Sequence, residues 1–257
     1  REHEVPHLTL GKIGLFAKNC YHLDDNGDPT KFRAYKNPAD IQNLRAIRLL
    51  REYFPQTRLL IGIRHPISWF QSFYNYRIQN TGTMPNPNTL HSCRQDSQGV
   101  CMKRADYHLS LVRLGKTNYT QEQDAFSLAS EWNNLVKDDP VRSPNPVFLY
   151  DTEQLADQDQ ERMAQFRQDL QEFLGLSEPL PPVLHYSPGK ILNETLQQER
   201  DAKKIDICSD QFVELRKILL DKAKRSAYYI GKYFIHAPDV MVSSPDYFVQ
   251  ILDAYTQ

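Results

Sequence analysis

The spacing of apolar and polar residues along the chain predicts several amphipathic helices. The clearest follows Pro38, where apolar residues recur at helical intervals as far as about residue 54. Asn37 stands where an N-cap residue precedes proline at the first helical position. The segment after Pro66 is aromatic and helix-like. Helical spacing also marks residues 105–115 with Gly115 as the C-terminal glycine, and residues 124–138, 158–176, 210–235 and 245–255.

Two short apolar runs predict strands, at residues 57–64 (TRLLIGIR) and 147–155 (VFLYDTEQL), and residues 10–17 could form a third. The first run has a continuous apolar centre at residues 59–63 and is bounded by helix breakers, which predicts a strand buried on both faces of a parallel sheet. Strands that alternate with helices predict an α/β fold in three layers with a mostly parallel central sheet. Ligands of such sheets bind at the carboxyl ends of the strands, where Arg64 stands.

Composition limits what the chain can bind as a whole. Of the 257 residues 40% are hydrophobic, which is enough for a sizeable core and predicts one domain, with two small ones as the alternative. The 31 lysines and arginines nearly balance the 32 acids. No overall field therefore draws the protein to nucleic acid or an anionic membrane, and any anion site must be local. No apolar run approaches the roughly 20 residues of a membrane span, and the first residues do not resemble a signal peptide.

Several features point to an oxidising compartment. Cys93 and Cys101 bracket a stretch inside the long loop at 81–101, at a spacing that a disulfide could close, although two unrelated thiols would give the same pattern. The triplets that begin at Asn118 and Asn193 would be glycan acceptors in a secreted protein. The cysteines show no metal-ligand spacing, so we expect no zinc site.

Arg64 and Ser72 together suggest a clamp for an anion. An arginine at the end of a strand presents five N–H donors in a rigid fork that suits phosphate or sulfate oxygens. Ser72 follows eight residues later, about two helical turns on, and its hydroxyl could bind the same anion. The alternative is structural: an arginine paired with a carboxylate, and a serine bonded to its own helix.

The segment RHPISWFQSFY, residues 64–74, resembles the part of the PAPS-dependent sulfotransferases that binds the 3′-phosphate of PAPS (3′-phosphoadenosine 5′-phosphosulfate). The resemblance implies that Arg64 and Ser72 contact this phosphate and that Tyr74 lies beside them. It covers most of residues 18–176, through the lead-in to residue 64, the second strand run and the FLGL helix end. It is closest to Golgi carbohydrate sulfotransferases, and residues 99–117 and 239–248 are similar to algal sulfotransferase-like proteins. The fold it implies is the P-loop-like sulfotransferase fold.

The chain departs from that family where the 5′-phosphosulfate is bound. The family's Lys-Ser-Gly-Thr type loop is not found, and the GKIG stretch at residues 11–14 lacks the hydroxyl residues and the helix start of a phosphate loop. We therefore expect one sulfotransferase-like domain over residues 1–257 that lacks its first strand and phosphosulfate loop. The loop either lies upstream of Arg1 or has been lost.

The resemblance also implies catalytic residues near the start of the chain. A base must take the acceptor's proton as the sulfuryl group arrives. Glu4 is the first candidate and His7 the second, within REHEVPHL. Lys18 matches a family lysine that could stabilise charge on the transferred group. Lys190 falls where the family carries a basic loop over the nucleotide, although the order of residues differs. The alternative for Glu4 and His7 is that they are merely solvated terminal residues. The alternative for Lys18 is an exposed lysine beside a packed cysteine, Cys20.

The resemblance therefore implies transfer of a sulfuryl group from PAPS to a hydroxyl or amine of a carbohydrate, without a metal, in the Golgi lumen or elsewhere in the secretory pathway. We expect a carbohydrate acceptor, no nucleic-acid partner, and membrane attachment only through an N-terminal anchor outside this chain. The alternative is a catalytically inactive relative that serves as a subunit or binding module of a larger assembly. A P-loop kinase is less consistent, because no GxxxxGK[ST] motif is present.

Overall fold

The computed structural model describes residues 40–81, 107–116, 142–182 and 194–257. In these ranges the chain is α/β, with a parallel three-stranded sheet in the order β1-β2-β3. The strands are β1 (Leu59–Ile63), β2 (Val147–Asp151) and β3 (Val240–Met241). The parallel arrangement and the positions of β1 and β2 confirm the sequence prediction, whereas β3 was not predicted.

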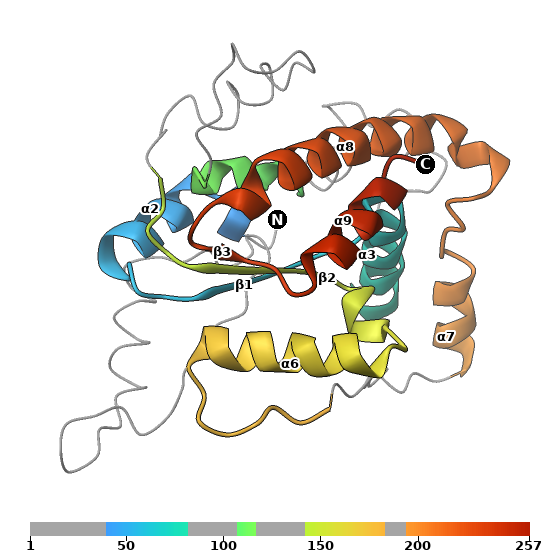
Figure 1. The fold of residues 1–257 in the computed structure, drawn as a ribbon. Helices are drawn as coiled ribbons and strands as arrows, with labels where there is room; N and C mark the ends of the chain where they lie inside the picture. The colour runs from blue at the N-terminus through green and yellow to red at the C-terminus, as the bar shows by residue number, and fades with distance from the viewer. Residues whose placement is uncertain (1–39, 82–106, 117–141, 183–193) are drawn as a thin grey trace.

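Helices cover both faces of this sheet (Figure 1). Helix α6 (Gln160–Leu174) lies along one face, and α8 (Val213–Lys232) and α9 (Pro245–Ala254) lie along the other. Helices α2 (Leu44–Tyr53) and α3 (Pro66–Thr81) flank β1 in the chain, and α7 (Glu194–Asp201) lies at the periphery. No helix in the described ranges has the length and apolar character needed to cross a bilayer.

The alternation of side chains along β2 builds the two layers of the core. Phe148 packs against Phe166 and Phe173 of α6, with ring centroids 5.7 and 5.5 Å apart. Val147 and Leu149 point the other way and join the main core with residues of α8 and α9. β2 is consequently buried on both faces, as a central parallel strand should be.

β1 differs from the prediction that it is buried on both faces. Ile61 and Ile63 are buried in the main core, but Leu60, which points to the opposite face, remains 48% exposed. In the described residues β1 is one of the two edge strands of the sheet. On the face of the sheet that α6 covers, α6 packs mainly against β2. It therefore leaves Leu60 of β1 largely exposed.

The helix boundaries show where local signals compete. The prediction of an N-cap at Asn37 is wrong for α2, because Asp40–Gln42 first forms a 3-10 turn. The N-cap of α2 is Asn43. Its side chain accepts hydrogen bonds from the N–H groups of Arg45 and Ala46. The predicted helix that ends at Gly115 is a 3-10 helix, Leu109–Leu114, and Gly115 does take the left-handed conformation at its end. Residues 10–17 and 124–138 lie outside the described residues.

Helices α3 and α8 form a second core cluster beside the sheet. Phe70, Tyr74 and Ile78 recur every four residues on α3 and pack against Leu215 and Leu219 of α8. This contact fixes the roll of α3 about its axis. The remaining faces of α3 are thereby set relative to the carboxyl end of β1.

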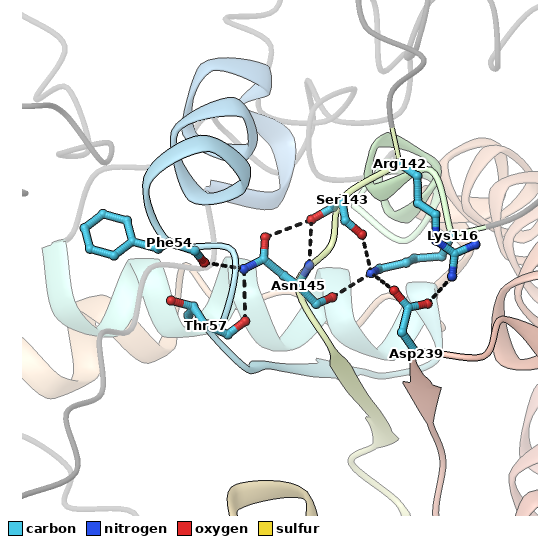
Figure 2. A network of polar contacts seen from close by, with 7 residues as sticks. All are labelled: Phe54, Thr57, Lys116, Arg142, Ser143, Asn145 and Asp239. Atoms are coloured by element: carbon cyan, nitrogen blue, oxygen red, sulfur yellow. Dashed lines mark hydrogen bonds and ion pairs between the residues drawn. The ribbon is translucent and has the colours of Figure 1, made fainter.

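A buried polar network ties the amino-terminal ends of β2 and β3 together (Figure 2). Lys116 is fully buried, and its Nζ donates to the carbonyl oxygens of Ser143 and Asn145, both at 2.6 Å, and to Asp239 Oδ2. The other carboxylate oxygen of Asp239 accepts from Arg142. All three donors of the buried ammonium are used, which is the condition for a charge to be tolerated in a core.

Candidate functional site

The carboxyl ends of β1 and β2 meet at one edge of the sheet and place Arg64 beside Asp151. Ile63 is in register with Asp151, and the N–H of Thr152 donates to the carbonyl oxygen of Ile63 at 2.9 Å. Arg64 is thus the first residue beyond the paired part of β1. This is the edge at which ligands bind in parallel α/β sheets.

The main chain of Arg64 is held by a buried histidine. The N–H of Arg64 donates to His108 Nε2 at 3.4 Å, and His108 is only 1% exposed. Burial lowers the pKa of His108 to about 3, so the ring is neutral at pH 7 and can accept through Nε2. The proton must then sit on Nδ1, which has no hydrogen-bond partner in the described part of the chain.

The side chain of Arg64 is exposed and is not neutralised by a contacting carboxylate. Neither a hydrogen bond nor an ion pair of its guanidinium is found within the described ranges. Its positive charge still affects Asp151 at the carboxyl end of β2. Burial raises the pKa of Asp151, and Arg64 partly opposes this by lowering it. The structural alternative, an arginine bound to a carboxylate, does not hold for the described residues. Arg64 is therefore positioned as a donor that a ligand could use.

Ser72 is also exposed, on a face of α3 that points away from the core cluster. It lies six residues beyond Pro66, about 9 Å along the helix axis. Ser68 and Ser72 are four residues apart on α3 and share this face. Ser72 and Arg64 make no direct contact in the described residues. An anion held by both would have to lie between them, over the first two turns of α3.

Tyr74 does not share that face. Successive helical residues are about 100° apart, so Tyr74 lies about 200° around the axis from Ser72. It is fully buried in the α3–α8 cluster, where burial raises the pKa of its hydroxyl to about 12. This position suits a residue that fixes α3 in place and does not suit direct contact with a nucleotide.

His65 holds the first turn of α3 in place next to Arg64. His65 Nδ1 accepts from the N–H of Ile67 at 3.3 Å, which satisfies one of the free donors at the beginning of the helix. The ring of His65 is half-buried and lies 5.0 Å from the ring of Tyr255. Burial lowers the pKa of His65, although Glu153 opposes this shift. His65 therefore has a structural role in the turn between β1 and α3.

A buried carboxyl at the same edge was not singled out from the sequence. Asp151 is fully buried, and its Oδ1 accepts from the N–H of Glu153 at 2.8 Å, while Oδ2 accepts from the hydroxyl of Tyr255. Burial raises the pKa of Asp151 to about 6. The sequence signal was an acid placed directly at the end of an apolar strand. Its partner, 104 residues away, left no local trace.

Most of the other predicted site residues lie outside the described ranges. These are Glu4, His7, Lys18 and Lys190, together with the GKIG stretch, Cys93, Cys101, Asn118 and Asn193. Their roles stay predictions. In the part of the chain that the structure does describe, no group of three or more histidine, cysteine or acidic residues is arranged to hold a metal ion.

The site at this edge therefore consists of an exposed guanidinium, a hydroxyl on the following helix, and a buried framework of His108, Asp151 and Tyr255. Such an arrangement can bind an anion and hold it in a fixed orientation. Comparison with models of protein families, with curated proteins and with solved structures gave no match to this chain.

Proposed function

We propose that the protein is a sulfotransferase that moves a sulfuryl group from PAPS to a hydroxyl or amine of a carbohydrate. The observation that carries the proposal is Arg64, exposed and without a contacting carboxylate in the described residues, at the carboxyl end of β1. Ser72 on the following helix supports it. The resemblance of residues 64–74 to the 3′-phosphate segment of the PAPS-dependent sulfotransferases gives the chemical class, and the finer P-loop-like fold is part of the same proposal.

In this reaction the bond between the sulfur and the phosphate oxygen of PAPS breaks as the acceptor's oxygen or nitrogen bonds to sulfur. Arg64 and Ser72 would hold the 3′-phosphate, away from the bond that breaks, and so fix the donor for in-line attack. The acceptor's proton needs a base, for which Glu4 and His7 are the predicted candidates. Lys18 would stabilise charge on the transferred group, and Lys190 would close over the nucleotide.

Binding of the nucleotide product PAP tests the site by thermal unfolding. PAP should raise the melting temperature, since a ligand that binds only the folded state stabilises it by mass action. Arg64→Ala should abolish this rise and Ser72→Ala should reduce it, because each removes a donor to the phosphate. Arg167→Ala removes an arginine from the middle of α6, which covers the face of the sheet opposite α8 and α9, and should leave the rise unchanged.

The outcomes separate the site from the chemistry. An unchanged melting curve of the parent protein in PAP would contradict the nucleotide site. A rise that depends on Arg64, without transfer of labelled sulfate from PAPS to any carbohydrate acceptor, would contradict the enzymatic role and favour the inactive relative.

A further inference from the structure

A basic cavity of about 200 Å³ opens at the opposite, amino-terminal edge of the sheet. The residues around it come from segments that precede β2 and β3 and from the end of α8. β2 spans five residues, so about 17 Å of strand separates this edge from the edge of Arg64. Its lining includes Lys116, Arg142, Lys232, Tyr233 and His236.

The charges around the cavity are unbalanced. Lys116, Arg142 and Lys232 are cationic, and Asp239 is the acid that contacts two of them. None of the described residues that line the cavity is acidic. Among the described residues, three cations and one acid therefore leave two positive charges around one small cavity, in a chain whose formal net charge is −1.

Arg142 is held by a contact that leaves some of its donors available. Arg142 uses Nη2 for Asp239, and its side chain is 40% exposed, so the other edge of the guanidinium can still reach a ligand. Lys116 spends its donors inside the network and contributes only its charge. Asp239 thus holds two cations side by side without cancelling both.

Lys232 is fixed by aromatic neighbours. Its Nζ bonds to the hydroxyl of Tyr228 at 2.5 Å and lies 4.8 and 5.2 Å from the ring centroids of Tyr228 and Tyr233. These contacts orient the ammonium and supply no formal negative charge. The hydrogen bond to Tyr228 is the main reason that the pKa of Lys232 is raised. The ammonium therefore stays charged over the whole physiological pH range.

We infer that this cavity binds a tetrahedral oxyanion, a sulfate or phosphate group, through Arg142, Lys232 and His236, with Lys116 adding to the field. A fork of guanidinium donors beside an ammonium suits the oxygens of such a group. The volume accommodates the anion and part of a molecule that carries it. The site is independent of the nucleotide proposed to bind at Arg64.

Calorimetric titration with sodium sulfate and sodium phosphate, against sodium chloride at the same ionic strength, tests the inference. The Arg64→Ala variant is used as the parent, so that the proposed nucleotide site does not contribute. We expect saturable binding of one anion. Arg142→Gln and Lys232→Gln should each weaken it about tenfold, since each removes one charge-assisted contact. Lys232 does not contact Asp239, so Lys232→Gln still tests the anion site even if Arg142→Gln disturbs the fold.

Lys217→Gln is the matched control, because it removes one exposed lysine from the same helix away from the cavity. A sulfated disaccharide and its unsulfated counterpart form the second arm. Tighter binding of the sulfated sugar than of inorganic sulfate would identify an anion carried on a carbohydrate, and equal affinities would identify the free ion. Absence of saturable binding, or equal weakening in all three glutamine variants, would overturn the inference.

Discussion

Replacing Asp239 with alanine is expected to lower the free energy of unfolding by about 3–5 kcal/mol, the usual cost of removing one partner from a buried ion pair. Lys116 is fully buried, and without Asp239 its charge would face only two carbonyl oxygens. Arg142 would lose its carboxylate as well. Urea unfolding at pH 7 measures the change. Asp253→Ala, which removes an exposed acid from α9, should change the free energy by less than about 0.5 kcal/mol.

The loss in the Asp239→Ala variant should also depend on pH. Burial already lowers the pKa of Lys116, and Asp239 is the main influence that raises it. Removing Asp239 lowers the pKa of the folded-state amine further below its unfolded value. The unfolded state then binds more protons, so the variant regains stability as the pH rises toward 9. A loss under 1 kcal/mol, or one that is the same at pH 7 and pH 9, would contradict the role assigned to this pair.

The second large effect is the response of stability to acid, which we expect His108 to dominate. Its pKa is about 3 in the folded protein and near 6.5 when unfolded. Below pH 6.5 the unfolded state takes up a proton that the folded state refuses, so this group lowers the stability by about 2 kcal/mol between pH 7 and pH 5. His65, whose pKa is also lowered, acts in the same direction.

Asp151 opposes this response. Its pKa is raised to about 6, so between pH 6 and its unfolded value near 4 the folded state binds more protons than the unfolded state. Acidification from pH 7 to pH 5 therefore recovers about 1 kcal/mol through Asp151. The contributions of His108 and Asp151 can be separated, because acidification lowers the stability through His108 and raises it through Asp151.

The variant His108→Gln isolates the histidine. Glutamine has an amide oxygen that can still accept the hydrogen bond from Arg64, but it does not titrate. The loss of stability from pH 7 to pH 5, followed by urea unfolding, should be about 2 kcal/mol smaller in this variant than in the parent. Asp151→Asn should instead enlarge the loss by about 1 kcal/mol. Identical pH responses of the parent and His108→Gln would contradict the buried, neutral histidine.

The elements that the sequence predicted well are those with strong local patterns. The apolar runs of β1 and β2 and the helical spacing of α3, α6, α8 and α9 are confirmed. α7 carries a single apolar residue, Leu196, and β3 has only two residues, so neither left a pattern to detect. The start of α2 was predicted too early in the chain, because Asn37 and Asn43 both precede helix-forming segments. Only Asn43 caps the α-helix.

The candidate site was predictable only in part, for the same reason. Arg64 and Ser72 are close in sequence, and the strand–helix junction between them could be read locally. The framework beneath them depends on pairs far apart along the chain: Arg64 with His108, 44 residues away, and Asp151 with Tyr255, 104 residues away. The Lys116–Asp239 pair spans 123 residues. Single-sequence patterns carry no information on such pairings, which tertiary packing alone creates.

The most direct measurement of the central claim compares the affinities of PAP and adenosine 5′-monophosphate, which lacks the 3′-phosphate, by calorimetric titration of the parent protein and Arg64→Ala. If Arg64 holds the 3′-phosphate, the parent should prefer PAP by roughly ten- to a hundredfold, the range for a lost charge-assisted contact, and Arg64→Ala should bind both nucleotides with nearly equal affinity. Equal affinities in the parent, or a preference for PAP that survives in Arg64→Ala, would contradict it.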